Sequence, residues 1–423
     1  MVIDLGDASA VPETPPSPGA TRRRPMALGL VLLATLALAG AGPAEPPRVR
    51  PILVTDDLAG AFTLAPSALF TSSFVGRQAL VRRYSLADSS VQWTTALPQS
   101  VGDLELAGAD VLTVTSPENA QTSFLDSDTG TVLWRRTAGA TTVLTATDDS
   151  VLMTSAGAAI EYIVLERAAL RTGKPLWSRR LDAAGYLDVG DAGRIVTVDR
   201  QGRAAVLSLA DGTVRATADL GVELNLGRFA GDGDTTRFVT SGDRLYLTRR
   251  EGGAGSVTAY RLTDLRQLWR KAIPFGWPTG CGAYLCVSTA AGMTVLDAGT
   301  GDARWSSTDW RLGADSAALR IPGPARLMVT DARHTARRAL LDPATGRMRS
   351  MLGHSEQVGA LLLRVDMAEP GRTWIQQLGP GDEVRTIGRL DGMSLERCLA
   401  VAAYLACANR NGRANVWQLM SDS

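Results

Sequence analysis

A short unit that recurs along this 423-residue chain constrains its fold more than any other feature. The clearest copy, residues 124–134, reads FLDSDTGTVLW: a strand-like run, a turn at Asp-x-x-Thr-Gly and a second run that ends on tryptophan. Further clear copies lie at residues 170–177, 296–305 and 341–350, and weaker ones at 84–93, 207–216 and 260–269. Because one such unit cannot bury its apolar face alone, the chain is expected to stack many copies side by side.

The spacing of these copies indicates the architecture. Their last positions fall at residues 93, 134, 177, 216, 269, 305 and 350, with a fainter copy near Arg385, so the intervals run from 35 to 53 residues. A period of about 42 residues matches a four-stranded propeller blade. We therefore predict an all-β fold, a β-propeller of four-stranded blades over residues 59–420, with eight blades or, as the alternative, seven.

Two segments do not fit this count cleanly. Apolar strands at residues 398–419 come in addition to the eight copies, so the segment at 353–392 is predicted not to form a complete blade by itself. Residues 44–58 are interpreted as a linker, in which residues 49–55 supply a strand that closes the ring.

The residues of the repeat are interpreted as structural. The aspartate can accept hydrogen bonds from the next backbone amides, the glycine supplies positive φ, and the indole offers an apolar surface to the neighbouring blade. A side chain that recurs once per blade is a packing element before it is a site. This structural role is assigned to Asp126, Gly130, Trp134, Gly173, Trp177, Trp269, Asp297, Gly301, Trp305, Asp342 and Gly346.

The N-terminal region indicates where the protein resides. Residues 1–21 are rich in Pro, Asp and Ala without apolar periodicity, which predicts a disordered cytoplasmic tail. Three arginines at 22–24 precede an uncharged apolar run at 26–42, so residues 22–43 are predicted to be a signal-anchor transmembrane helix. The run is slightly shorter than a hydrocarbon core of about 30 Å and contains A-x-A patterns, which leaves a cleaved signal peptide open. Both readings place the propeller outside the cytoplasm, either as a single-pass membrane protein or secreted.

Four cysteines form two close pairs, Cys281 with Cys286 and Cys398 with Cys407. Neither pair has the C-x-x-C spacing of zinc or redox sites, and an even number in an exported domain favours disulfides. A short hairpin would bring each pair together. We therefore predict the two local disulfides, with buried free thiols as the alternative.

Charge and motifs exclude several function classes. The chain has 44 Lys+Arg against 43 Asp+Glu, which argues against a nucleic-acid-binding protein. Its two histidines, His334 and His354, leave no histidine-rich metal set, and no G-x-S-x-G, P-loop or G-x-G-x-x-G motif occurs. The sequence therefore predicts no catalytic residues, no metal site and no bound cofactor. Lysine occurs only at Lys174 and Lys271, so arginine carries the positive charge, which indicates a GC-rich bacterial genome.

The strand, the Asp-x-x-Thr-Gly turn and the step to tryptophan resemble the repeats of pyrroloquinoline-quinone-like β-propellers over residues 60–419. This family contains quinoprotein dehydrogenases and noncatalytic relatives. The dehydrogenases hold their quinone under a disulfide between adjacent cysteines, beside a calcium ion. No adjacent pair occurs among Cys281, Cys286, Cys398 and Cys407, so the resemblance implies a noncatalytic member.

These observations together predict a noncatalytic extracytoplasmic platform, held at the membrane by its N-terminal helix, that binds a protein or another cell-envelope partner. The alternatives are an extracytoplasmic enzyme with a funnel site, either a quinoprotein-type oxidoreductase or a glycan-acting enzyme, and a transmembrane sensor. Gly-, Pro- or Asp-rich segments at 226–236, 251–256 and 274–279 are the predicted partner surface.

The arginine-flanked apolar run leads to a testable prediction. The protein is expected to fractionate with membranes, and protease added outside the cytoplasmic membrane is expected to digest the propeller. Immunoblotting of fractions from intact and permeabilised cells measures both. Recovery of full-length, protease-protected protein from the soluble cytoplasm would contradict the prediction.

Overall fold

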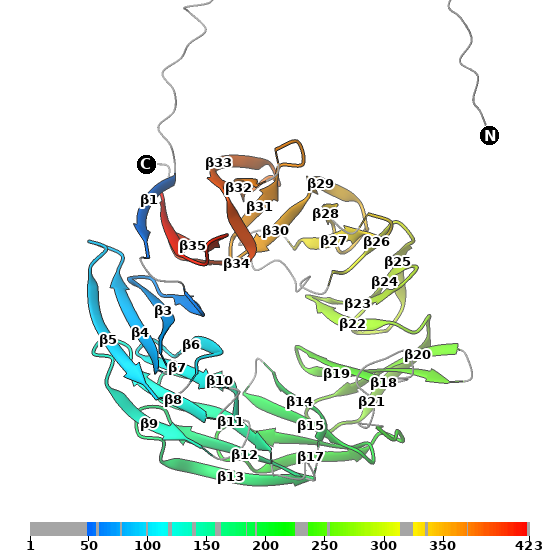
Figure 1. Ribbon diagram of the computed structural model, residues 1–423. Coiled ribbons are helices and arrows are strands. Elements are labelled where there is room, and N and C mark those ends of the chain that lie inside the picture. Colours follow the sequence, from blue (N-terminus) through cyan, green and yellow to red (C-terminus); the bar gives the residue numbers. More distant parts are fainter. Residues whose placement is uncertain are drawn as a thin grey trace, which may run out of the picture. The chain divides into compact units, whose positions relative to one another are not determined.

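The computed structural model describes most of the chain after residue 48 (Figure 1). The described residues are 49–420 with the exception of 56–58, 77, 99, 117–120, 138–140, 157–161, 183, 191–192, 225–235, 252–253, 314–324, 335–336 and 370. The regular elements of this part are all β-strands, and they form nine four-stranded antiparallel sheets. These sheets are the blades of a β-propeller, which we number along the chain.

The first five blades follow one another without a break in strand order. Blade 1 contains β2 (Phe62–Leu64), β3 (Ala68–Val75), β4 (Gln78–Ser85) and β5 (Val91–Leu97). Blade 2 contains β6 (Asp103–Ala107), β7 (Val111–Ser116), β8 (Gln121–Asp126) and β9 (Val132–Arg136). Blade 3 contains β10 (Thr141–Ala146), β11 (Ser150–Ala156), β12 (Tyr162–Ala169) and β13 (Pro175–Asp182). Blade 4 contains β14 (Ala184–Gly190), β15 (Arg194–Asp199), β16 (Arg203–Ser208) and β17 (Val214–Asp219). Blade 5 contains β18 (Thr236–Ser241), β19 (Arg244–Glu251), β20 (Ala254–Arg261) and β21 (Gln267–Ala272).

The remaining blades include one that combines both ends of the described chain. Blade 6 contains β22 (Trp277–Cys281), β23 (Tyr284–Thr289), β24 (Gly292–Asp297) and β25 (Ala303–Ser307). Blade 7 contains β26 (Trp310–Arg311), β27 (Leu327–Asp331), β28 (Arg338–Leu341) and β29 (Met348–Gly353). Blade 8 contains β30 (Ser355–Val358), β31 (Leu361–Val365), β32 (Arg372–Leu378) and β33 (Val384–Asp391). Blade 9 contains β34 (Met393–Val401), β35 (Tyr404–Asn409), β36 (Ala414–Leu419) and, as its outermost strand, β1 (Val49–Val54).

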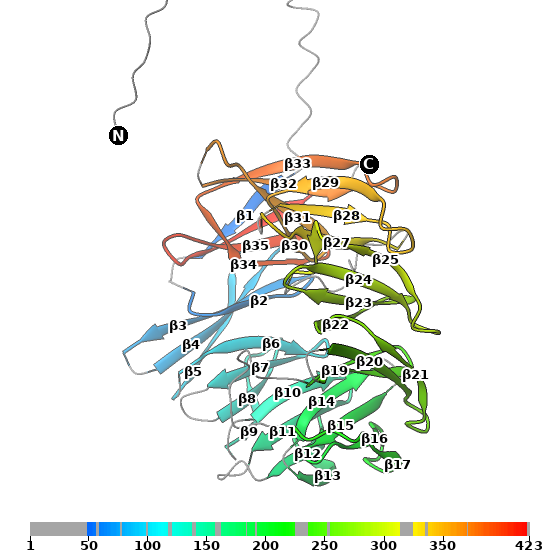
Figure 2. The same ribbon diagram turned by 90° about the vertical axis from the view of Figure 1, so that its right-hand side faces the viewer.

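The position of a strand in its blade explains its sequence. Second strands such as β15 and β23 are buried along almost their whole length because neighbouring blades cover both faces, and they read as apolar runs. Outer strands such as β13 and β17 alternate between exposed and half-buried positions, because one of their faces meets solvent. In Figures 1 and 2 the blades follow one another around a ring.

Apolar clusters join each blade to the next and close the ring. One cluster, for example, combines Phe70 and Val81 of blade 1 with Leu112 and Leu125 of blade 2. A corresponding cluster lies at every one of the nine junctions between described blades, including the one between blades 9 and 1. Strand β1 is antiparallel to β36, which puts Val49 opposite Leu419.

The predicted number of blades, eight with seven as the alternative, is wrong. Residues 355–391 form the complete blade 8, and β34, β35, β36 and β1 form a further one. The prediction that 353–392 does not form a complete blade is also wrong, and it arose because the copy near Arg385 is faint: the outer strand β33 has no tryptophan at the repeat position. The strand register puts Gly388 opposite Ile375, where other blades have tryptophan, and Val49 packs against this glycine.

The predicted transmembrane helix, residues 22–43, and the predicted tail, residues 1–21, lie outside the described residues, as does most of the 44–58 linker. Within the described ranges no helix has the length and apolar character needed to cross a membrane.

Candidate functional site

The tryptophans of the repeat lie at the junctions between blades. Trp134, at the outer strand of blade 2, covers Gly173 in the last turn of blade 3, where φ is 65°. A Cβ atom on Gly173 would lie 2.5 Å from the indole ring, so only glycine allows this approach. The Trp134 Nε1–H donates a hydrogen bond of 2.8 Å to the Leu170 carbonyl oxygen, which fixes the indole against the next blade.

The same contact recurs at four other junctions. At each, the indole covers a glycine with positive φ in the next blade, and its N–H donates to a backbone carbonyl beside that glycine. The four sets are listed in the order tryptophan, glycine and residue of the accepting carbonyl oxygen, with the hydrogen-bond length. They are Trp93, Gly130 and Ser127 (3.0 Å), Trp177, Gly212 and Leu209 (3.1 Å), Trp269, Gly301 and Ala298 (3.1 Å), and Trp305, Gly346 and Pro343 (2.9 Å).

Where the indole is missing, the glycine of the next blade is missing too. Ala216 stands at the tryptophan position of blade 4, and the facing turn of blade 5 carries Leu265 at φ 54°, whose side chain joins the same apolar cluster as Ala216. Ser350 stands at this position in blade 7, and the turn of blade 8 carries Asp382 at φ 67°. Without an indole opposite, a residue with a Cβ atom fits in the turn. The remaining unfavourable contribution is the left-handed backbone conformation of that residue.

An ion pair takes the place of the indole between blades 7 and 8. The Arg326 guanidinium, 1% exposed, pairs with the Asp382 carboxylate, and Arg349 lies 3.2 Å from the other oxygen of Asp382. Arg326 also donates a hydrogen bond of 3.0 Å to the Gly379 carbonyl oxygen. These bonds compensate for burying the charges, which is costly without partners.

The aspartates of the repeat hold their own turns. One carboxylate oxygen of Asp297 accepts hydrogen bonds from the Gly299 and Thr300 amides at 2.9 and 3.1 Å, and its other oxygen accepts one from Arg304 at 2.5 Å. Asp126 and Asp342 accept the equivalent amide bonds from residues 128 and 129, and 344 and 345. These carboxylates are therefore already occupied in the turns.

Charge partners explain how these carboxylates titrate. The arginine hydrogen bonds hold the pKa of Asp297 and that of Asp342 below their ordinary values. Burial raises the pKa of Asp126, but hydrogen bonds from Arg171 and Thr129 outweigh it, so the net shift of this pKa is also downward.

Both predicted disulfides are present. Cys281 on β22 bonds Cys286 on β23, and Cys398 on β34 bonds Cys407, which lies directly opposite on β35 with a Cα–Cα distance of 4.1 Å. The described chain contains no free cysteine. Cys286 and Cys407 are fully buried in the clusters between blades, so these disulfides cannot form the lid of a quinone site.

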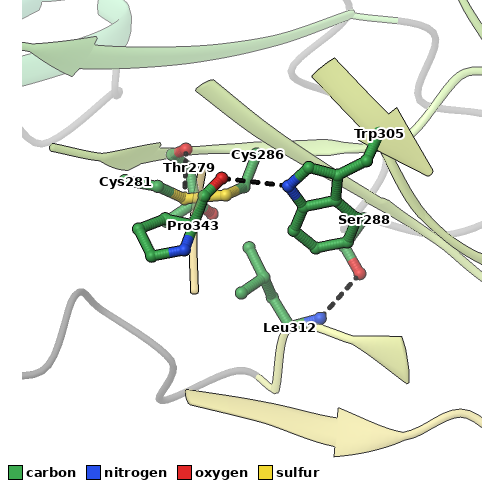
Figure 3. The surroundings of a disulfide bond; sticks show 7 residues. All are labelled: Thr279, Cys281, Cys286, Ser288, Trp305, Leu312 and Pro343. Carbon is green, nitrogen blue, oxygen red and sulfur yellow. Dashed lines mark hydrogen bonds between the residues drawn. A yellow bond between two sulfur atoms is a disulfide. The ribbon is translucent and has the colours of Figure 1, made fainter. Parts of the chain in front are cut away.

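The Cys281–Cys286 disulfide lies at the junction of blades 6 and 7 (Figure 3). Two hydrogen bonds join the blades here: Trp305 Nε1–H donates to the Pro343 carbonyl oxygen, and the Leu312 amide donates to Ser288 Oγ at 3.2 Å. Leu312 belongs to the same apolar cluster as the two cysteines. The disulfide therefore supports the wall of blade 6 at this junction.

A cavity of about 610 Å³ opens at this junction. The described residues that line it belong to blades 6 and 7: Trp277, Pro278, Thr279, Ser288, Thr289, Ala290, Arg311, Leu312, Gly313, Thr330 and Arg338. A volume of this size is typical of sites for small ligands.

Trp277 distinguishes this cavity from the other junctions. Among the nine tryptophans it is the one that is more than half exposed, at 52%. The Arg237 guanidinium lies 4.4 Å from the centroid of the Trp277 ring, and that of Arg250 lies 4.8 Å from the centroid of Phe275. The indole of Trp277 is therefore exposed and stacked by a cation, unlike the tryptophans that cover glycines at the junctions between blades.

Trp277 lies in one of the segments predicted to be partner surface, but its place in the fold differs from the expected one. Segment 274–279 was predicted to be partner surface because of its Gly and Pro residues, but Trp277 begins β22, the inner strand of blade 6. The segment at 251–256 is the end of the β19–β20 hairpin, of which 252–253 lie outside the described residues, and 226–236 lies outside them except for Thr236. The remaining signal was that Trp277 is a tryptophan outside the repeat spacing.

Metal-binding side chains do not gather in the described part of the chain, which contains no group of three or more His, Cys, Asp or Glu residues arranged to hold an ion.

The chain has distant similarity to several solved structures. No family model and no curated protein matches the chain. Similar solved structures include BamB from Moraxella catarrhalis, with 13% identity, a TM-score of 0.45, and coverage of 88% of this chain and 99% of that one. The Dos1 propeller has 10% identity, a TM-score of 0.47, and coverage of 88% and 96%. A europium-containing methanol dehydrogenase has 13% identity, a TM-score of 0.40, and coverage of 88% and 84%. Similarities this distant carry no argument about this chain, so its function must be argued from its own residues.

The indole–glycine contact predicts different costs for two glycine substitutions. Gly173→Ala is expected to destabilise the protein more than Gly242→Ala, although φ is positive at both, 65° and 60°. The methyl group at 173 would overlap the Trp134 ring, whereas nothing lies within 4 Å of a Cβ atom at 242. The left-handed backbone alone costs roughly 1–2 kcal/mol, which we expect for Gly242→Ala, with more for Gly173→Ala. Urea denaturation of the full chain measures both; equal losses would contradict the contact.

Removing the indole provides the second half of this test. Trp134→Ala is expected to destabilise the protein by about 3 kcal/mol, the lower end of the range for aromatic truncation, because the indole is only partly buried. In that background Gly173→Ala should cost no more than Gly242→Ala. A melting midpoint unchanged by Trp134→Ala would show that the indole is not structural.

Proposed function

We propose that this protein is an exported, noncatalytic propeller that binds a component of the cell envelope through the inner face of blades 5 to 7. The observation that carries the proposal is the exposed Trp277 ring with the Arg237 guanidinium stacked on it. Tryptophan and arginine are the residue types that most often dominate binding surfaces. Because the stacking limits the movement of both side chains, little conformational entropy is lost when a partner binds.

The division of the tryptophans between two roles supports this reading. Trp93, Trp134, Trp177, Trp269 and Trp305 are each engaged in a junction between blades, with the N–H hydrogen-bonded. Trp277 lies outside this pattern and exposes apolar surface to water, which is unfavourable. A bound partner would cover this surface.

An extracytoplasmic location is part of the proposal. Two disulfides support it, because disulfides persist in oxidising compartments. The arginines at 22–24 and the apolar run at 26–42 supply an export signal, which remains in place as an anchor or is cleaved.

We also propose a noncatalytic place among the pyrroloquinoline-quinone-like propellers. The cysteine pairs are 5 and 9 residues apart in sequence, and Cys286 and Cys407 have no exposed surface for a quinone to pack on. The residues present therefore do not fit the cofactor arrangement that this family uses for catalysis.

Trp277→Ala tests the binding function. The variant is expected to lose the envelope component that the immobilised full-length protein retains from detergent extracts of native membranes. Its melting midpoint should change little, because the ring is half exposed, whereas Trp134→Ala should show the reverse pattern. Mass spectrometry of the retained material measures the loss. Uptake of stoichiometric quinone with calcium, accompanied by dye reduction on alcohols or sugars, would overturn the noncatalytic function.

A further inference from the structure

Two arginines and a threonine form a row across blade 7. Arg311 on β26 is paired with Thr330 on β27, and Thr330 is paired with Arg338 on β28. Residues directly opposite one another on adjacent strands project to the same face of a sheet. Neighbouring strands are about 4.8 Å apart, so the side chains of Arg311 and Arg338 start from the two strands on either side of Thr330.

This row is positively charged without an internal counter-charge. Neither Arg311 nor Arg338 forms a salt bridge with a carboxylate of the described residues, and none of the described residues that line the cavity is acidic. The arginines of the repeat turns differ, because Arg171 and Arg304 lie 2.6 and 2.5 Å from aspartate oxygens. An anion between Arg311 and Arg338 would supply the missing charge, and planar guanidinium groups bind carboxylates with two parallel hydrogen bonds.

The residues of blade 6 that line the cavity offer a different chemistry. They provide the exposed indole of Trp277 together with the hydroxyl groups of Thr279, Ser288 and Thr289. An indole packs against the apolar face of a ring, and hydroxyl groups can donate to and accept from the hydroxyls of a ligand. A sugar ring with a carboxylate matches both the arginines of blade 7 and the residues of blade 6, whereas a bare anion uses only the arginines.

We propose that the cavity between blades 6 and 7 binds an acidic saccharide. Arg311 and Arg338 bind the sugar carboxylate on either side of Thr330, and Trp277 contacts the face of the ring. The proposal rests on the binding function above and names the chemical class of the ligand. The volume of about 610 Å³ fits a short oligosaccharide or the end of a longer chain.

Calorimetric titration of the full-length protein in detergent micelles tests this assignment. The probes are trigalacturonic acid, its neutral counterpart galactotriose, and inorganic phosphate. The acidic trisaccharide is expected to bind, more weakly as salt concentration rises, while galactotriose and phosphate bind at least roughly tenfold more weakly. Equal binding of galactotriose, or phosphate binding as tight as that of the uronate, would overturn the proposal.

Three variants connect the binding to the named residues. Arg311→Gln and Arg338→Gln are each expected to weaken uronate binding by roughly tenfold or more, because each removes charge-assisted hydrogen bonds. Arg333→Gln is the matched control, since Arg333 is an exposed arginine of the same blade outside the cavity lining, and it should bind as the unchanged protein does. Equal losses in all three variants, or no loss in the first two, would contradict the site. If Arg311→Gln lowers the melting midpoint, Arg311→Lys keeps the charge and should still lose affinity.

The two proposals fail in different ways. If Arg311→Gln releases the envelope component but trigalacturonic acid does not bind, the saccharide assignment is wrong and the binding platform stands. If Trp277→Ala retains the envelope component unchanged, the platform proposal itself is wrong, whatever the titration shows.

Discussion

The packing of an indole on a left-handed glycine of the next blade is the contact on which this propeller depends. Trp134 needs the missing side chain of Gly173 to reach the Leu170 carbonyl, and the turn around Gly173 needs a residue that tolerates positive φ. A single glycine satisfies both requirements, so the contact between indole and glycine sets the distance between the two blades that it joins. The exceptions follow the same rule, because Leu265 and Asp382 replace glycine where Ala216 and Ser350 replace the indole.

Closure makes the junctions interdependent. Each blade packs on two neighbours, and the ring ends where β1 pairs with β36, so residues 49 and 419 belong to one sheet. The two disulfides lie beside irregular parts of this ring. Cys398–Cys407 joins two strands of blade 9, whose fourth strand comes from the other end of the described chain, and Cys281–Cys286 lies against blade 7, whose inner strand β26 has two residues. One disulfide therefore lies within the blade that joins both ends of the described chain, and the other lies in blade 6 beside the blade with the shortest inner strand.

The sequence predicts a structural feature well where the residues that form it lie close together along the chain. Turn, glycine and tryptophan occur within one short segment, and each cysteine pair lies on one hairpin, so fold class and disulfides could be predicted. Blade 8 could not be recognised as a complete blade, because Gly388 stands at its tryptophan position. The ion pair at its junction with blade 7 joins Arg326 and Asp382, which are 56 residues apart. Such a pair has no local pattern. The row of Arg311, Thr330 and Arg338 is also created by strand register across separate segments, which no spacing along the chain reveals.

The candidate binding site lies where the repeat is most altered. Strand β26 pairs only with Thr330 and Asp331 of β27, so the rest of β27 has no inner neighbour among the described residues, and the cavity opens at this position. Trp277 projects there from β22 while Trp305, in the same blade, makes the ordinary contact with Gly346. Local departures from a consistent pattern are expected at functional sites, because selection retains them against their cost in stability. The eight other blades can hold this irregular blade in place, which leaves Arg311 and Arg338 available for a ligand instead of a neighbouring carboxylate.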